Sequence, residues 1–121
     1  MTDKATAFRW ADLPAEEVSP TLARRLISGE RVMLAQVSLR KDGIVPKHRH
    51  VHEQFTVVTR GALRFRIGDE GDEIIIRSGE VLHIPSDVPH EAVVLEDSEV
   101  LDVFSPPRED WLAGTDTYLR R

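Results

Sequence analysis

The sequence predicts an all-β protein built as a barrel or a sandwich. From residue 31 onward, short apolar runs are separated by turn residues. The runs are VMLAQVSL, QFTVV, ALRFRI, EIIIR, EVLHIP, EAVVL and EVLDVF. Within ALRFRI, Leu63, Phe65 and Ile67 alternate with Arg64 and Arg66, which is the period of a strand with one buried face. Many short strands at this spacing are typical of a sandwich or a barrel.

The expected elements follow one another with a turn signal between them. The segment from Ala15 to Ile27 is either a helical turn or a leading edge strand. The polar stretch GDEGD reverses the chain between ALRFRI and Glu73–Arg77, which predicts a hairpin. A short C-terminal turn is expected at Arg108–Leu112. Glycine or aspartate marks the other turns, at Lys41-Asp42-Gly43, Arg60-Gly61, Ser78-Gly79 and Pro85-Ser86-Asp87.

Length and composition indicate a small globular protein. We expect one domain over 1–121, with a core at about 31–105, an N-terminal strand or arm at 1–30 and a C-terminal tail at 106–121. No apolar stretch approaches the roughly 18 residues of a membrane span, so no membrane segment is expected. The N-terminus lacks a secretory pattern and there are no cysteines, which together predict a cytoplasmic location. The net charge of −5, with scattered basic residues, argues against nucleic acid as a partner.

The stretch HRHVHEQ concentrates histidine in a few positions. If it forms a regular strand, His48, His50, His52 and Gln54 share one face and can point into one cavity. Imidazole is the commonest protein ligand for transition metals, and His90, which opens the run EAVVL, is the natural additional ligand. The alternative is a solvated polar strand without an ion. These residues alone do not decide between the two.

Two spaced motifs resemble those of the cupin family. The first runs glycine, His-x-His, three or four residues, glutamate, six residues and glycine. The second runs glycine, five residues, Pro-x-Gly, two residues, histidine and, after three more residues, asparagine. The matching positions are Gly43, His48, His50, Gln54 and Gly61 in the first motif, and Gly79, Pro85 and His90 in the second. Gln54 replaces the glutamate, Asp87 replaces the glycine and Val94 replaces the asparagine.

The resemblance implies a single-domain cupin, which is an antiparallel jelly-roll barrel with a divalent metal ion inside. It assigns four metal ligands, at His48, His50, Gln54 and His90. His52 and Glu53 are alternatives to Gln54, although Glu53 has the wrong parity unless the strand bulges. His83 is most simply a strand histidine with a hydrogen-bonded partner.

Neutral ligands have a chemical consequence. Three imidazoles and one amide oxygen leave the ion its full double charge, which makes it a stronger Lewis acid and favours stabilisation of an enolate or alkoxide. Zinc, nickel, manganese, cobalt and iron all suit such a set of donors. Oxygenase chemistry is less favoured, because iron sites more often include a carboxylate.

A second constellation lies in LDVFSPPREDW. Asp102 and Phe104 share a strand face, and the Ser-Pro-Pro turn can bring Arg108 beside them. Asp102 is a candidate proton shuttle and Arg108 a candidate carboxylate clamp. The alternative is a structural ion pair between Asp102 and Arg108, with Phe104 filling the core.

The two constellations together resemble the small bacterial cupins that linearise unsaturated uronates from pectin and alginate breakdown. The resemblance implies that Asp102, Phe104 and Arg108 are active-site residues and that the substrate is a small sugar acid. Other possible functions are a cupin dioxygenase or isomerase, and a non-catalytic sugar-acid-binding protein. A homodimer through edge strands is also expected, with Ala5–Ile27 as the packed or exchanged segment.

Overall fold

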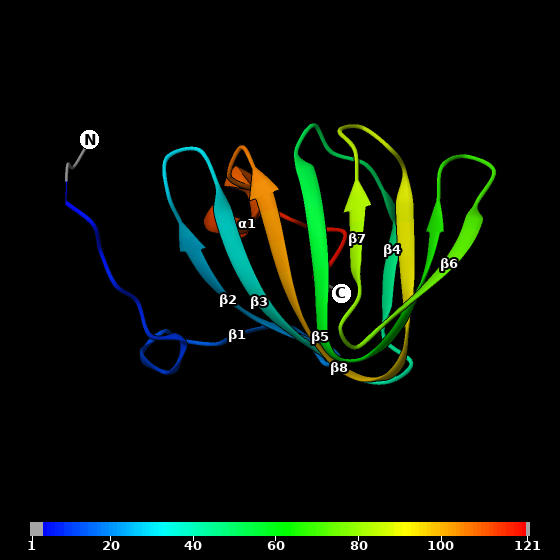
Figure 1. Cartoon of the computed structure of the whole chain (residues 1–121), viewed down its shortest axis with the longest axis horizontal. Coiled ribbons are helices and arrows are strands. Elements are labelled where there is room, and N and C mark those ends of the chain that lie inside the picture. Colours follow the sequence, from blue (N-terminus) through cyan, green and yellow to red (C-terminus); the bar gives the residue numbers. More distant parts are fainter. Residues whose placement is uncertain (1–3, 121) are drawn as a thin grey trace.

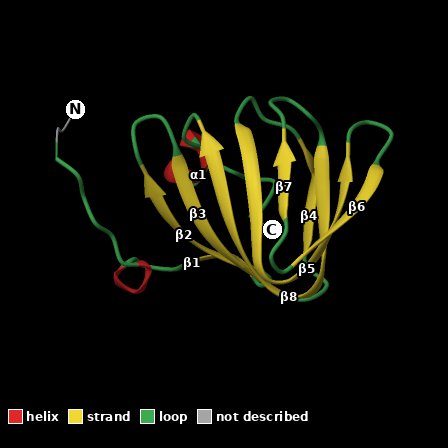
Figure 2. Ribbon diagram, viewed as in Figure 1, coloured by secondary structure: helices red, strands yellow, loops and turns green. Residues whose placement is uncertain are grey.

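The computed structural model describes residues 4–120 and confirms the all-β class (Figures 1 and 2). The described chain contains eight strands, a 3-10 helix named η1 and a short α-helix named α1. In chain order they are η1 (Trp10–Asp12), β1 (Glu16–Ser19), β2 (Leu22–Ser28), β3 (Met33–Leu39), β4 (Ile44–His48), β5 (Glu53–Ile67), β6 (Asp72–Arg77), β7 (Val81–Ile84), β8 (His90–Ser105) and α1 (Glu109–Ala113). Within this range no helix is long and apolar enough to cross a membrane.

The long strands β5 and β8 join the two layers of the barrel. They pair antiparallel with each other along nearly their whole length. The second half of β8 also pairs with β3, which leads on to β2 and β1, whereas its first half pairs with β4. The first half of β5 pairs with β7 and its second half with β6. Each long strand therefore belongs to both layers, and Figure 1 shows both strands curving at the base of the barrel.

The bend in β5 requires a glycine. The register between β5 and β8 shifts around Arg60 and Gly61. Gly61 has a φ of 91°, in the left-handed region that favours glycine. A Cβ atom at this position would collide with the hydroxyl of Ser98 and the carbonyl of Asp97. The closing glycine of the first motif therefore permits the close approach of the two long strands.

The core lies between the layers and is built from alternate residues of the strands. In β3, Met33, Ala35 and Val37 are buried while the residues between them are half-buried. In β5, Leu63 and Phe65 point inward, as the alternation predicts. The C-terminal segment also contributes buried apolar side chains to this cluster, from Trp111 and Leu119.

Several sequence predictions can be compared with these elements. The GDEGD hairpin is confirmed as the β5–β6 turn, and the short C-terminal turn is confirmed as α1. The segment from Ala15 to Ile27 forms the β1–β2 hairpin rather than a helical turn. The prediction that HRHVHEQ forms one regular strand is wrong, because β4 ends at His48 and β5 begins only at Glu53.

A buried ion pair attaches the C-terminal segment to the barrel. The guanidinium of Arg24 on β2 donates to both carboxylate oxygens of Asp116, with Nη1 at 2.7 Å and Nη2 at 3.2 Å. Both side chains are fully buried. Arg24 also lies over the ring of Trp111, 4.4 Å from its centroid. These contacts place the segment that follows α1 against the mouth of the barrel.

Candidate metal centre and active site

Three histidines from separate segments converge inside the barrel. His48 ends β4 and His90 begins β8, and the two are direct partners in the β4–β8 ladder. His50 lies in the loop between β4 and β5, where its carbonyl accepts a hydrogen bond from the backbone N–H of Asp87 at 2.8 Å. The candidate ligand nitrogens of the three rings all lie within 4.8 Å of one another. The structure thus brings together the three predicted histidines although they do not share a strand.

Asp87 also accounts for a departure from the cupin motif. This residue has a φ of 62°, in the region where glycine is favoured and aspartate is tolerated. The aspartate therefore adopts the backbone conformation that the motif glycine would provide, and the turn still holds the loop that carries His50.

Each ring has its Nδ1 atom beside a backbone carbonyl. The distances are 2.7 Å from His48 to Pro46, 3.0 Å from His50 to His52 and 2.9 Å from His90 to Val88. Because a carbonyl can only accept a hydrogen bond, Nδ1 carries the proton in each neutral ring and Nε2 keeps its lone pair. This tautomer is ready to bind a metal through Nε2, with the carbonyl fixing the ring orientation.

Burial keeps these imidazoles uncharged at neutral pH. It lowers the pKa of His48 to about 4 and the pKa of His50 to about 3, and it also lowers the pKa of His90. Repulsion from His90 adds to the effect on His48, and repulsion from Arg108 adds to the effect on His50. A metal binds only the deprotonated nitrogen, and because the pKa values of these rings are lowered, protons compete weakly with a metal at neutral pH.

Gln54 provides an oxygen beside the histidines. Its Oε1 lies 3.1 Å from Nε2 of His50, while its Nε2 donates to Oγ1 of Thr56 at 2.9 Å and to Oδ1 of Asp102 at 3.4 Å. The His50 nitrogen and the Gln54 oxygen are therefore two electron-pair donors facing each other, an arrangement that a cation between them stabilises. With the other two histidines they form a donor set that fits a divalent transition metal.

The same network explains why position 54 holds an amide. The hydroxyl of Thr56 donates to Asp102 at 2.6 Å, so its oxygen must accept from Gln54. A carboxylate at position 54 would offer only acceptors to these neighbours and would lie against a second carboxylate.

We therefore expect Gln54→Glu to lower the free energy of unfolding of the metal-free protein by about 1–3 kcal/mol at pH 8. Repulsion between the two carboxylates raises the pKa of the introduced glutamate in the folded state. The folded state therefore keeps a proton that the unfolded state has released, and the free energy of unfolding falls as pH rises above about 4. Urea titrations at about pH 5 and pH 8 measure this dependence. Gln54→Met, similar in length but uncharged, serves as the control, and an equal pH dependence in both variants would contradict the explanation.

The two alternatives to Gln54 lie elsewhere. Glu53 accepts a hydrogen bond from Nε2 of His83 at 2.7 Å, and both side chains are exposed. His83 therefore has the hydrogen-bonded partner that the sequence led us to expect. The ring of His52 packs edge-on against His50, with centroids 5.3 Å apart, and lies outside the group of converging nitrogens.

Asp102 is a buried carboxylate with one free oxygen. Thr56 and Gln54 both donate to its Oδ1, and among the described residues no donor is bound to Oδ2. Burial raises the pKa of Asp102 to about 6. Asp102 and Phe104 are both buried on the same face of β8, as predicted. A carboxyl group with this pKa can accept or donate a proton near neutral pH.

Arg108 is buried beside the same cavity but is not paired with Asp102. Its Nε and Nη2 donate to the two carboxylate oxygens of Asp110, at 2.9 Å and 2.8 Å. The guanidinium carbon lies 5.0 Å from the ring centroid of Phe104. The alternative of a structural ion pair between Asp102 and Arg108 is therefore wrong, because each has other partners.

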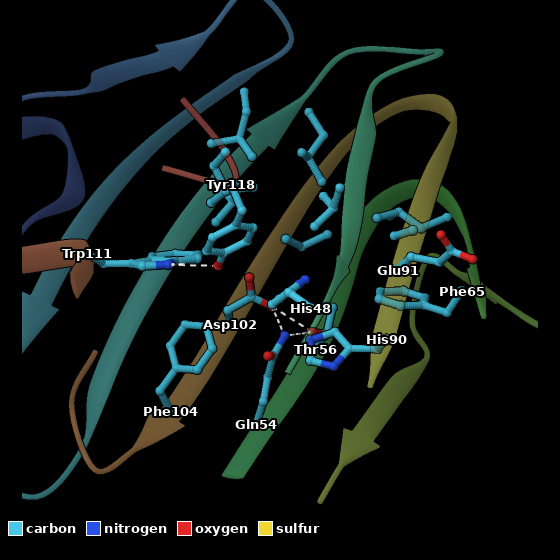
Figure 3. Close-up of a pocket in the computed structure, with 18 of the residues that line it drawn as sticks. His48, Gln54, Thr56, Phe65, His90, Glu91, Asp102, Phe104, Trp111 and Tyr118 are labelled. Carbon is cyan, nitrogen blue, oxygen red and sulfur yellow. Dashed lines mark hydrogen bonds between the residues drawn. The ribbon is translucent and has the colours of Figure 1, made fainter. Parts of the chain in front are cut away.

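One cavity joins these groups. Its lining includes two of the histidines together with Gln54, Asp102 and Phe104 (Figure 3). Arg108 lines it as well. It also includes four polar or aromatic residues that the sequence analysis missed, which are Thr56, Glu91, Trp111 and Tyr118. Strand parity with Gln54 could have identified Thr56. Nothing in the local pattern marks Trp111 or Tyr118, because the folding back of the C-terminal segment places them there.

Comparison with known proteins gives consistent matches. The profile of the family described as Cupin domain matches residues 35–104. The pectin degradation protein KdgF of Dickeya dadantii is 32% identical over 104 residues, which cover 84% of this chain and 93% of that protein. This relationship confirms the resemblance that the sequence motifs indicated.

Solved structures agree with the fold. The structure of KdgF from Halomonas sp. superposes with a TM-score of 0.82 at 28% identity, covering 89% of this chain and 99% of that one. An RmlC-like cupin from Shewanella frigidimarina superposes with a TM-score of 0.80 at 23% identity, covering 91% and 99% of the two chains. The latter likeness shows the fold alone.

Proposed function

The chain belongs to the cupin family, and from this premise we propose that it is an enzyme of pectin breakdown that opens the ring of 4,5-unsaturated uronates to give linear 5-keto-4-deoxyuronates. One observation carries the proposal. A set of neutral donors suited to a metal lies in one cavity with a buried carboxylate that has a free oxygen, in a chain related to a pectin degradation protein.

The metal ligands in this proposal are His48, His50, Gln54 and His90. They are supported by the convergence of the three ring nitrogens and by the Gln54 oxygen that faces His50. A divalent ion held there would act as a Lewis acid that stabilises negative charge developing on substrate oxygen.

Asp102 moves the proton in this proposal. The substrate is a cyclic enol ether with a hydroxyl on carbon 1. Removing the proton of that hydroxyl breaks the bond between carbon 1 and the ring oxygen, which forms an aldehyde and leaves the electrons as an enolate. Protonation at carbon 4 then completes the linear 5-keto product. Asp102, with its free Oδ2 and a pKa near 6, is suited to take the first proton and deliver the second.

Arg108 and Phe104 hold the sugar acid. The Nη1 atom of Arg108 has no hydrogen-bond partner among the residues that the structure describes, so it is available to bind a carboxylate or a hydroxyl. The ring of Phe104 packs against the sugar and limits the access of water. Because Arg108 already forms an ion pair with Asp110, the guanidinium is held in place before substrate arrives.

The direct test follows the reaction itself. The protein is loaded in turn with zinc, nickel, manganese, cobalt or iron and mixed with 4,5-unsaturated galacturonate. We expect the ultraviolet absorbance of the conjugated acid to disappear faster than in the spontaneous reaction, at a rate proportional to protein concentration. The absence of acceleration with every metal would overturn the proposal.

The protein is also proposed to act as a homodimer through its N-terminal segment. β1 is an edge strand of the sheet, and residues 4–9 extend away from the barrel in Figure 1. Phe8, in this extended part, is 57% exposed. An extended segment beside an open sheet edge can pair with a second copy. Sedimentation velocity measures the mass of the protein in solution, and we expect the mass of two chains rather than one.

A further inference from the structure

Tyr118 is the only tyrosine of the chain, and it lies against the candidate metal centre. Its ring stacks on the imidazole of His48, with centroids 4.4 Å apart and planes 28° apart. It lines the same cavity as Asp102 and Phe104, and Figure 3 shows its hydroxyl beside Trp111. No role has yet been given to this hydroxyl in the proposed reaction.

The hydrogen bonds of this hydroxyl leave its proton unused. The Tyr118 oxygen accepts from Nη2 of Arg108 at 3.0 Å and from Nε1 of Trp111 at 3.1 Å. Guanidinium and indole nitrogens can only donate, so neither of them can receive the hydroxyl proton. Within residues 4–120 no acceptor is bound to this O–H. The proton is thus available to an acceptor that enters the cavity.

The position of the hydroxyl is fixed by packing rather than by ligand. Trp111 is buried, and the nearby Asp116 is tied to Arg24 by two hydrogen bonds at 2.7 Å and 3.2 Å. The stack on His48 orients the ring from the other side. A donor held in advance loses little conformational entropy when a ligand binds.

The chemistry of the surroundings indicates an anionic oxygen as the acceptor. A hydroxyl that accepts a hydrogen bond from a cation is polarised and becomes a stronger donor. Nη1 of the same Arg108 is also without a partner in the described chain, and Arg108 and Tyr118 both line the cavity, which therefore has two unused donors. Hydrogen bonds to charged acceptors are the strong ones, and a carboxylate has two oxygens to receive them.

We infer that Tyr118 is a substrate-binding residue whose hydroxyl donates a hydrogen bond to the carboxylate of the bound sugar acid, beside Nη1 of Arg108. The inference rests on the proposed function for the class of ligand. It gives the C-terminal segment, which also lines the cavity with Trp111, a direct contact with the ligand.

The test compares two stable ligands in two proteins. Calorimetry measures the affinity of metal-loaded wild type and Tyr118→Phe for saturated galacturonate and for its uncharged methyl ester. Tyr118→Phe keeps the ring on His48 and removes only the hydroxyl. We expect it to weaken binding of the acid by roughly 10-fold or more and binding of the ester by less than about 2-fold. Equal losses for the two ligands, or no loss for the acid, would overturn the inference.

Two controls separate binding from structure. Metal content and the midpoint of thermal unfolding are measured for both proteins, because a merely structural role would move them without distinguishing the acid from the ester. If Tyr118→Phe does not fold, 3-fluorotyrosine incorporation labels Tyr118 alone in the otherwise unchanged chain. We expect galacturonate to shift the fluorine resonance more than the ester does, and identical shifts would count against the inference.

The result is independent of the reaction assay. If wild type fails to open unsaturated galacturonate but the acid-specific loss is observed, the proposed reaction fails and the carboxylate contact stands. If wild type opens the ring and Tyr118→Phe binds both ligands as wild type does, the carboxylate contact fails and the reaction stands.

Discussion

His90→Ala is expected to abolish both metal binding and ring opening. His90 is the most buried of the three histidines, begins β8 and lies directly opposite His48 in the sheet. Its loss would leave two imidazoles and a neutral amide oxygen, so one of the three strong nitrogen donors would be missing. We expect the metal content to fall from about one ion per chain to a small fraction of that, and the rate to fall by more than about 100-fold.

The matched control for this experiment is His83→Ala. His83 is a histidine of β7 that is exposed and bound to Glu53, away from the cavity. We expect this variant to keep its metal and its rate. Metal content by elemental analysis and the absorbance assay measure both variants. A His90→Ala protein with full metal content and normal turnover would remove the basis of the proposed site.

Asp102→Asn is expected to lower turnover by more than about 100-fold while leaving the metal in place. Asparagine has the same shape as aspartate, and its oxygen can still accept from Thr56 and Gln54. It cannot exchange a proton near neutral pH, so the proton transfer is lost and the surrounding hydrogen bonds remain. The change should therefore appear in kcat more than in KM.

Two measurements make this result specific. Elemental analysis establishes whether Asp102→Asn retains its ion, and circular dichroism establishes whether it is folded. Asp97→Asn alters an exposed aspartate of β8 whose carboxylate accepts from the backbone N–H of Lys41, and we expect it to leave kcat unchanged. Near-normal turnover in the Asp102 variant would mean that another group moves the proton.

The fold could be predicted because alternation and turn residues are local signals. In ALRFRI, the alternation identified the inward Leu63 and Phe65, and GDEGD identified the following turn. The same rule placed Asp102 and Phe104 on one face of β8. These predictions hold because a regular strand fixes the direction of every second side chain.

Local strand rules do not account for the way HRHVHEQ brings its side chains together. Parity grouped His48, His50 and Gln54 as one strand face, yet the chain leaves β4 after His48 and re-enters the sheet at Glu53. The rings converge because His48 pairs with His90 and because the turn containing Asp87 holds the loop at His50. The spacing of the family motifs contained this information, whereas strand geometry did not.

The C-terminal part of the site could not be predicted from local sequence. Tyr118 reaches the cavity because Asp116 binds Arg24, a residue 92 positions earlier in the chain. Neither periodicity nor a turn signal encodes such a distant contact. The alternative ion pair between Arg108 and Asp102 was also wrong, because Asp110, only two residues away, binds the guanidinium instead.

The sharing of β5 and β8 between both layers makes the ligand set depend on the integrity of the whole barrel. Gln54 lies near the start of β5 and His90 at the start of β8, and these positions are at opposite ends of the β5–β8 ladder. Separating the two donors would require unzipping the pairing that holds both halves of the molecule. A substitution that weakens the β5–β8 pairing should consequently lower metal affinity as well as the free energy of unfolding, even when it lies far from the cavity.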